Sequence, residues 1–291
     1  MKHYPLITVV IATLGGKSLI SMLTKLNSGS VIPKEILVCI PEGVVVHSDV
    51  LSKENVRLVV VPCRGQVAQR AFGFQMATYE YVMQMDDDLF VDHHCLEHLV
   101  RASQIFGPNV AVSPALINKD SGGSVYKRPE GSKLLIDIYF WLMNGTKGYQ
   151  PGSIDSSGSA VGVDSDLSES RFIKVEWLAG GCVLHRRKNL VLEDFWSRPG
   201  KAYYEDLLHS HILSKKEIIL MVDTLARCEL EIVRQSSMTF RGFMSDFCGD
   251  FFARRYYMKK VSRSSARMYI YYFIRFVSYA FGRIRSRWHV L

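Results

Sequence analysis

Three consecutive acidic residues, Asp86, Asp87 and Asp88, directly follow the largely apolar run 81–85. A buried strand that ends in such a cluster holds negative charges close together, which is costly unless a cation or a donor-rich ligand lies against them. Carboxylate oxygens at this spacing suit a hard divalent ion that keeps water and phosphates as its other ligands. The triplet therefore predicts a site for Mn²⁺ or Mg²⁺, with a solvated acidic turn after a strand as the alternative.

The elements that must position this triplet alternate between strands and helices. Apolar and β-branched runs predict strands at 7–12, 35–40, 56–61, 81–85 and 110–113. The spacing of apolar residues predicts one helix over 66–78 and two more that begin at the capping residues Ser18 and Asp92. This alternation is typical of right-handed βαβ units, so we predict an α/β fold with a Rossmann-like, mostly parallel central sheet and flanking helices.

Several polar side chains follow predicted strands at their carboxyl ends, where parallel sheets bind ligands. Thr13 follows the first strand, Glu42 the second and Arg64 the third. Together with the aspartate triplet after the fourth strand, these residues are expected to line one cleft.

The charge of this 291-residue chain is uneven. The formal net charge is +8, yet ten Lys and Arg lie between residues 254 and 287, and no acidic residue follows Asp250. The basicity thus belongs to a C-terminal tail. Six cysteines without a C-x-x-C pair indicate buried thiols in a reducing compartment rather than a zinc site. The start lacks the features of a signal peptide, so we expect a cytoplasmic protein.

Five motifs occur in order over roughly residues 5–235. They are Val10-Ile11-Ala12-Thr13 at a strand end, the helix Gly65–Gly73, Asp86-Asp87-Asp88, Trp177-Leu178-Ala179-Gly180-Gly181, and Tyr204-Glu205-Asp206. In this order they resemble the inverting family-2 nucleotide-sugar glycosyltransferases with the GT-A fold, of the type that builds bacterial surface polysaccharides. Each motif alone is weak, and five in register are specific.

The resemblance implies a role for each donor-side residue. Asp88 would ligate Mn²⁺ or Mg²⁺, Asp86 would lie nearer the ribose or the waters of the metal, and Asp87 would be the least direct. Such a cation stabilises the charge that develops on a nucleoside diphosphate as the glycosidic bond breaks. Thr13 is expected beside the nucleotide and Arg70 at its base or phosphates. A plain strand end and a surface helix residue are the respective alternatives.

The Glu205-Asp206 pair occupies the position of the family's general base, which takes the proton of the acceptor hydroxyl in an inverting displacement. Asp206 is the first choice for this role and Glu205 the second, while two acids that favour a helix dipole are the alternative. Gly180 and Gly181 would give the acceptor sugar close approach to the backbone. Trp177 is expected either to stack on a sugar face or to lie in the core.

Two departures from the family pattern concern the nucleotide base and the metal. Many relatives hold uracil with an acidic residue after the second strand, and Glu42 is the candidate substitute here, which favours a UDP-sugar but leaves the base open. Relatives with a metal often add a histidine well after the Glu-Asp pair, yet none occurs between His211 and His289. His209, one turn after Asp206, is the remaining candidate ligand, with an ordinary core or surface histidine as the alternative.

The domain prediction places a catalytic domain at residues 1–245. Regular patterning weakens inside it, and we expect a long mobile loop over about 118–170. Residues 246–291 are predicted to be a basic, aromatic, amphipathic helical segment at the membrane surface.

The tail is too short and too polar for a bilayer span. The aromatic stretch 268–281 contains Arg275 and falls short of the roughly 20 apolar residues that a span requires. One cationic helical stripe is predicted from basic residues that recur every four positions: Arg255, Lys259, Arg263 and Arg267. We expect this segment to lie on an anionic membrane surface. Packing on the catalytic domain and binding of nucleic acid are the alternatives.

Together these patterns predict an inverting, metal-dependent, hexosyltransferase-like glycosyltransferase. It would move a sugar from a nucleotide-diphosphate donor to a lipid-linked, undecaprenyl-type glycan at the cytoplasmic face of the inner membrane, in O-antigen or capsule synthesis. No nucleic-acid partner is expected. One alternative is a sugar-nucleotide nucleotidyltransferase, whose Gly-rich phosphate loop Gly15-Gly16-Lys17 resembles only weakly. The other alternative is a non-catalytic membrane-peripheral binding protein.

Overall fold

A computed structural model describes residues 4–196, 203–231, 239–263 and 265–288 of the chain. The chain divides into two compact units. Residues 1–127 and 163–235 contribute to the first, which we call the sheet unit, and residues 128–162 and 236–291 to the second, which we call the helical unit. The predicted boundary at residue 245 and the predicted mobility of 118–170 stay predictions.

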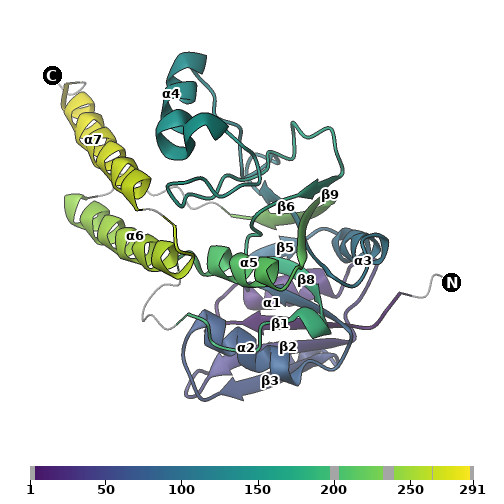
Figure 1. The fold of residues 1–291 in the computed structure, drawn as a ribbon. Coiled ribbons are helices and arrows are strands. Elements are labelled where there is room, and N and C mark those ends of the chain that lie inside the picture. The colour runs from purple at the N-terminus through teal and green to yellow at the C-terminus, as the bar shows by residue number, and fades with distance from the viewer. Residues whose placement is uncertain (1–3, 197–202, 232–238, 264, 289–291) are drawn as a thin grey trace. The chain divides into compact units, whose positions relative to one another are not determined.

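Within the described residues, the sheet unit contains a nine-stranded sheet in the order β3-β2-β1-β4-β8-β6-β9-β5, with β7 paired to β9 (Figure 1). The strands are β1 (Ile7–Ala12), β2 (Glu35–Pro41), β3 (Val56–Val61), β4 (Tyr81–Met85), β5 (Leu89–Val91), β6 (Val110–Asn118), β7 (Phe172–Lys174), β8 (Cys182–Arg186) and β9 (Ile219–Leu230).

The predicted parallel pairing holds from β3 through β2 and β1 to β4. Beyond β4 the sheet is mixed, because β8 runs antiparallel to both β4 and β6, while β6 and β9 are parallel. The predicted α/β class with a large central sheet is confirmed. The carboxyl ends of β1, β2 and β4 meet at one edge of the sheet, as the sequence led us to expect.

Helices cover both faces of the sheet, which explains why β1 is buried at all six positions. Ile11 belongs to a core cluster with Leu23 and Leu99, whereas its neighbour Val10 belongs to a cluster with Phe74, which lies in a helix on the other face. The helices of this unit are α1 (Leu19–Leu26), α2 (Gln66–Met76), α3 (Cys95–Ile105) and α5 (Glu205–Lys215), with 3₁₀ turns η1 (Ser48–Ser52) and η3 (Arg187–Asn189).

Two predicted capping roles are wrong. Ser18 flanks α1 but makes no capping bond with its side chain, because its own backbone angles are already helical. The helix α3 begins after His94 rather than after Asp92, since a turn closed by the bond from Cys95 N to Asp92 O precedes it.

A glycine brings α2 close to the sheet. A Cβ atom at Gly73 would lie 2.5 Å from Val10 Cγ1 and 2.6 Å from Cys39 Sγ, so no larger residue fits between the helix and strands β1 and β2. This close packing sets the first turns of α2 beside the carboxyl ends of those strands. Cys39 is one of four buried cysteines, the others being Cys95, Cys182 and Cys228, while Cys63 and Cys248 are exposed.

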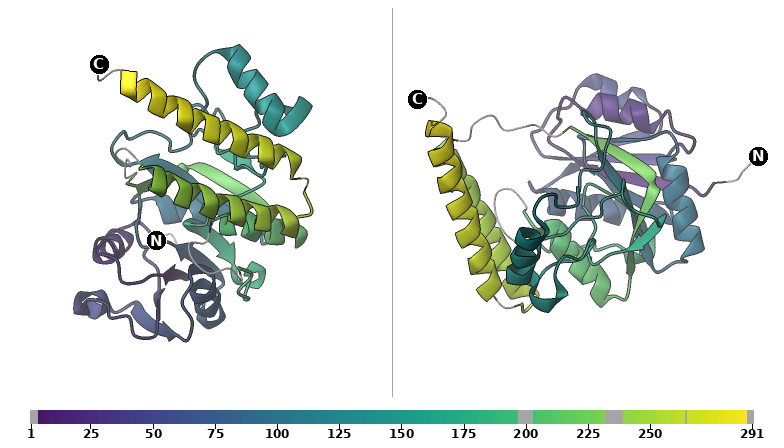
Figure 2. Two further views of the ribbon diagram at one scale, coloured as in Figure 1. Left: turned by 90° about the vertical axis from the view of Figure 1, so that its left-hand side faces the viewer. Right: turned by 90° about the horizontal axis from the view of Figure 1, so that it is seen from above.

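The helical unit consists mainly of α4 (Lys133–Asn144), α6 (Phe240–Lys260) and α7 (Ala266–Trp288), with a 3₁₀ turn η2 (Gly145–Lys147) after α4. The helices α6 and α7 lie side by side (Figure 2). Phe243 stacks on Tyr279 with ring centroids 3.6 Å apart, and Phe251 meets Tyr272 edge to face at 4.9 Å, so the pairing is antiparallel. Asp250 accepts hydrogen bonds of 2.6 Å from Tyr272 and from Arg275.

The predicted single cationic stripe is wrong, because α6 ends at Lys260 and a separate helix begins at Ala266. Arg263 lies between them and donates to the backbone oxygens of Ile154 and Asp155 at 3.0 and 3.1 Å. Arg263, which was predicted to face a membrane surface, thus binds backbone carbonyl groups of residues 128–162.

The Ser- and Gly-rich stretch around Asp155 has a linker-like composition but a closed, hydrogen-bonded structure. One Asp155 carboxylate oxygen accepts from the backbone N–H groups of Ser157 and Ser159, both at 2.9 Å. Arg254 of α6 donates to the Ser159 hydroxyl at 2.8 Å. Short polar side chains are common in flexible linkers but also form such turns, and composition alone does not separate the two. No helix in the described part of the chain combines the length and apolarity needed to cross a bilayer.

Candidate active site

The site begins where β1 ends. Thr13 is buried, and its backbone N–H donates to Cys39 O at 3.1 Å, which holds the ends of β1 and β2 together. Its hydroxyl donates to the carboxylate of Asp87 and accepts from Gly15 N at 2.9 Å. Two residues predicted on the donor side therefore meet directly, and Asp87 has the closest link to Thr13.

A buried arginine joins the two acidic motifs. Arg70, in the second turn of α2, lies 2.9 Å from Asp86 Oδ1 and 3.0 Å from Glu205 Oε1, with only 4% of its side chain exposed. Gln66, one turn earlier, donates to the same Asp86 oxygen at 2.8 Å. The triplet after β4 and the Glu-Asp pair at the start of α5 are thus brought to one place. We call Asp86, Arg70 and Glu205 the arginine clamp.

The electrostatics of the clamp follow from its burial. Burial lowers the pKa of Arg70, but the charges of Glu205 and Asp86 outweigh that effect and raise the pKa above its ordinary value. Burial raises the pKa of Glu205, although Arg70 opposes this. The second carboxylate oxygen of Glu205 is buried and has no hydrogen-bond partner among the described residues. The clamp therefore orients Glu205 while leaving one oxygen unused.

Asp206 differs from its neighbour because no arginine among the described residues forms an ion pair with it. Burial and the charge of Glu205 raise the pKa of Asp206 to about 7. One of its oxygens accepts from Leu207 N at 2.9 Å. A carboxylate with this pKa exchanges a proton near neutral pH, as a general base must.

Asp88 ends the triplet as an exposed residue. Partial shielding from water, together with the charges of Asp86 and Asp87, raises its pKa above the ordinary value. Crowded carboxylates favour a bound cation, and oxygen is the donor that Mn²⁺ and Mg²⁺ take. Among the residues that the structure describes, no group of three or more His, Cys, Asp or Glu is arranged to hold a metal ion. The triplet thus fits a partial ligand set that phosphates and water would complete.

Gly180 and Gly181 lie against the acids rather than in an open loop. A Cβ atom at Gly180 would be 2.8 Å from Glu205 Oε1, and one at Gly181 would be 3.1 Å from Asp86 Oδ2. Gln84 donates to Gly180 O at 2.6 Å, and Asp86 N donates to Gly181 O at 2.8 Å. The absence of side chains at these two positions is what lets β4 and the start of α5 share one small space.

Trp177 is buried and meets Tyr126 edge to face, with ring centroids 5.6 Å apart. Burial and the charge of Asp206 raise the pKa of Tyr126, which places the phenol near that carboxylate. Trp177 therefore lies in the core against Tyr126, a residue that was not predicted from the sequence. Its contact with an acceptor sugar stays a prediction.

His209 lies in the core. Its ring stacks on Phe195 and approaches His185, with centroids 5.5 Å apart in both cases. Burial and neighbouring positive charge lower the pKa of His209 well below its ordinary value, and that of His185 to about 3, so both rings are neutral. In the described residues, no hydrogen bond or ion pair joins His209 to the aspartate triplet. Metal ligation by His209 stays a prediction to which the structure adds no support.

Contact of Glu42 with a nucleotide base stays a prediction, and two glutamines at the site were not predicted from the sequence. Glu42 is exposed after β2, and its backbone N–H donates to Val61 O. Gln66 and Gln69 were missed, although both lie in the quoted helix motif. Gln69 donates to Thr13 O and Cys39 O at 2.9 and 2.8 Å and thereby supports the strand ends. A paired glutamine has no distinctive sequence signal, because its partners are backbone groups of distant strands.

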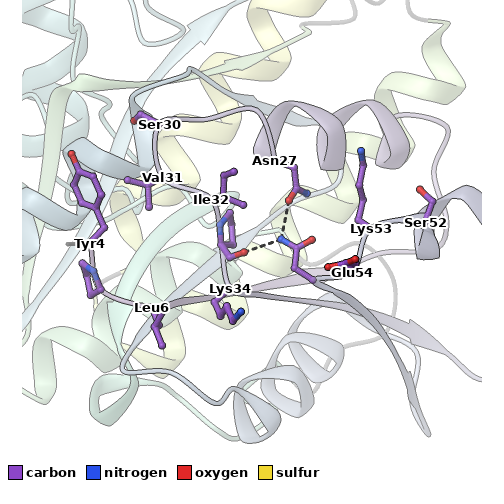
Figure 3. Close-up of a pocket in the computed structure, with 13 residues that line it drawn as sticks. Tyr4, Leu6, Asn27, Ser30, Val31, Ile32, Lys34, Ser52, Lys53 and Glu54 are labelled. Atoms are coloured by element: carbon purple, nitrogen blue, oxygen red, sulfur yellow. Dashed lines mark hydrogen bonds between the residues drawn. The ribbon is translucent and has the colours of Figure 1, made fainter. Parts of the chain in front are cut away.

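A cavity of about 830 Å³ lies at the opposite edge of the sheet (Figure 3). Leu6, Lys34 and Asn55 line it, and each directly precedes one of the strands β1 to β3. Asn55 Nδ2 donates to Asn27 Oδ1 and to Pro33 O, both at 2.8 Å. None of the predicted site residues lines this cavity, so its size does not make it the site.

Comparison with known proteins bears on the fold and on part of the chain. Residues 44–161 match the family model for glycosyl transferase family 2. This matched range includes the aspartate triplet and Arg70 but not Glu205. The solved structure of GalNAc-T7 with UDP, GalNAc and Mn²⁺ shares the fold, with a TM-score of 0.55 and 16% identity. The fold is GT-A-like. The similarity covers 80% of this chain and 44% of GalNAc-T7, so the chain spans less than half of that protein. No curated protein matches the sequence.

Proposed function

We propose that this chain is an inverting, metal-dependent glycosyltransferase that uses a nucleoside-diphosphate sugar, with a UDP-sugar favoured. The observation that carries the proposal is the arginine clamp, which joins the donor-side acid Asp86 to the acceptor-side acid Glu205 at 2.9 and 3.0 Å. The family-2 match of residues 44–161 and the fold shared with a protein solved with UDP, GalNAc and Mn²⁺ support the same function.

Asp88 and Asp86 are the residues that would hold Mn²⁺ or Mg²⁺. Bound there, the ion would offset the charge on the departing diphosphate. Thr13 and Asp87 would hold the loop after β1 against the nucleotide, since the Thr13 hydroxyl bonds to both Asp87 and Gly15 N. The residues present on the donor side therefore bind and orient more than they react.

Asp206 would take the proton of the acceptor hydroxyl. The hydroxyl oxygen forms its bond to the anomeric carbon as the bond from that carbon to the diphosphate breaks on the opposite side, which inverts the configuration. Glu205, fixed by Arg70, positions the start of α5 beside this step. Gly180, Gly181 and Trp177 would lie on the acceptor side.

The acceptor that we propose is a lipid-linked, undecaprenyl-type glycan of a bacterial surface polysaccharide, at the cytoplasmic face of the membrane. The support is compositional: the helices α6 and α7 combine basic and aromatic residues, and such segments prefer a membrane interface.

Thermal unfolding with nucleoside diphosphates tests the donor site. UDP with Mn²⁺ should raise the melting temperature of the wild type by several degrees, because a ligand that binds only the folded state stabilises it. Asp88→Asn should lose the shift, and Asp120→Asn, at an exposed acid, should keep it. An equal shift in Asp88→Asn contradicts the metal role.

Asp206→Asn tests turnover. It should keep the shift with UDP and Mn²⁺ while transfer falls by roughly 10²–10⁴-fold, the usual contribution of a general base. Donor binding without sugar transfer in the wild type would instead identify a binding protein. Release of pyrophosphate from a nucleoside triphosphate would identify a nucleotidyltransferase.

A further inference from the structure

The helix α4 exposes apolar side chains to an unusual extent. Four of its residues have exposed fractions of 67, 67, 46 and 58%: Leu134, Leu135, Ile138 and Trp141. Their spacing of i, i+1, i+4 and i+7 places them on one face of the helix. We call this face the α4 stripe. It lies within the stretch for which the sequence predicted only a mobile loop.

The helix α7 repeats the same spacing. Four of its exposed aromatic and apolar residues, at 51, 38, 70 and 44%, follow this spacing: Tyr269, Ile270, Phe273 and Phe276. We call this face the α7 stripe. The adjoining side of α7 packs on α6 through Tyr272 and Tyr279. Tyr269 and Phe276, at the edge of the stripe, also contact rings of α6 while remaining partly exposed.

The two striped helices belong to one body. Arg267, near the start of α7, donates to the carbonyl oxygens of Trp141 and Leu142 at the end of α4, both at 2.6 Å. The two helices also lie close together in both views of Figure 2. The two apolar faces are therefore carried by helices that hydrogen bonds join to each other.

Charge identifies what such a surface meets. The helical unit carries 14 Lys and Arg against 5 Asp and Glu, a net charge of +9, while the sheet unit has a net charge of −1. Large exposed apolar patches mark interaction sites, and an apolar face on a strongly basic unit is complementary to an anionic bilayer. Tryptophan and tyrosine prefer the boundary between lipid and water.

We propose that the α4 stripe and the α7 stripe together dock the protein on an anionic lipid bilayer, with α4 as an inserting element outside the C-terminal segment. The inference deepens the proposed function, since a lipid-linked acceptor gives the docking a purpose. The docking itself requires neither donor nor turnover.

Sedimentation with lipid vesicles tests the docking on the full chain. The wild type should bind vesicles of phosphatidylcholine with about 30% phosphatidylglycerol and bind much less to phosphatidylcholine alone. The double variant Leu134→Ser/Leu135→Ser should lower the partition coefficient at least about tenfold, because it removes the apolar contact with lipid. The matched control is Leu167→Ser, whose side chain in the sheet unit is 64% exposed and should not matter.

Tryptophan quenching by brominated lipid locates the inserted helix. Of the four tryptophans, Trp177 and Trp196 are buried and Trp288 is present in both proteins, so the part of the quenching that Trp141→Phe removes assigns the contact to α4. Equal quenching of the two proteins, or equal vesicle binding by the serine variant, overturns the proposal. So does a serine variant that changes only the oligomeric mass in light scattering, because the stripe would then contact a second copy.

The same protein samples separate this inference from the proposed function. If UDP with Mn²⁺ raises the melting temperature but the protein does not bind anionic vesicles, the docking proposal is wrong and the proposed function is unaffected. If the protein binds the vesicles but its melting temperature does not change with UDP and Mn²⁺, the proposed function is wrong and the docking proposal is unaffected.

Discussion

The sheet unit and the helical unit use arginine in opposite ways. Arg70 is buried between two carboxylates, in a unit whose net charge is close to zero. Arg267 binds backbone oxygens, in a unit of net charge +9 that turns apolar side chains outward. A buried charge holds its ion-pair partners in fixed positions, whereas an excess of surface charge attracts a partner with a large surface of opposite charge. The first arrangement suits catalysis, and the second suits binding to a membrane surface.

Loss of the clamp should have the largest effect on stability. Arg70→Met leaves the buried carboxylate of Glu205 without its ion-pair partner, so we expect the free energy of unfolding to fall by about 3–5 kcal/mol. Urea denaturation at pH 7 measures it. The matched control is Arg57→Met, which breaks an ion pair to Glu35 whose arginine is 50% exposed and should cost less than about 1 kcal/mol. Equal losses in the two variants would remove the distinction between buried and surface arginines.

The pH dependence of the sheet unit should follow Asp206. The unfolded chain releases this proton near pH 4, roughly the ordinary value for aspartate, and the folded protein releases it at about pH 7. Between these values the folded state binds more protons, so the free energy of unfolding contributed by this group falls as the pH rises. Glu205, whose pKa is also raised, acts in the same direction, while Arg70 opposes both and Tyr126 stays neutral.

Transferase activity should rise with pH over the range in which the free energy of unfolding falls. Transfer measured as kcat/KM should rise with pH up to about 7, as Asp206 loses its proton and becomes the base. Asp206→Asn should flatten the activity profile and reduce the slope of the stability profile, to which Glu205 still contributes. Vesicle binding should be insensitive to this substitution. A rising limb that persists in Asp206→Asn assigns the base to another group.

Gly180→Ala should disturb the site without unfolding it. The added methyl group would meet Glu205 Oε1 at 2.8 Å, and Arg70 holds that oxygen in place. We expect transfer to fall by roughly tenfold or more, because small displacements of positioned groups are costly in rate. Steady-state kinetics measures the loss, and the unchanged shift with UDP and Mn²⁺ is the control. Full activity would mean that Glu205 need not be positioned.

Glu42→Gln should have the smallest effect. Glu42 is exposed, so the melting temperature without ligand should not change. If Glu42 contacts uracil, the affinity for UDP should fall about fivefold, close to the 1 kcal/mol by which a hydrogen bond to a charged acceptor exceeds one to a neutral amide. Titration with ADP is the control. Equal changes for UDP and ADP would show that Glu42 does not read the base.

The local pattern of the sequence predicted β1, β4, α2 and the start of α5, together with the acids that follow or begin them. These features depend on residues close in the chain, because an apolar run or a helical repeat expresses itself within one element. The same reasoning failed for the cationic stripe, since nothing local marked the break between α6 and α7. It also missed α4, whose apolar residues lie in a Gly- and Ser-rich surrounding.

What the sequence by itself determined is therefore which acids stand at strand and helix ends. The tertiary structure alone decided which partner each acquired. Arg70 meets Glu205 across 135 positions of the chain, and His209 lies against Phe195 rather than beside the aspartates. The reason is that a buried charge must find its counter-charge wherever the folded core places one, and no repeat along the chain encodes that distance.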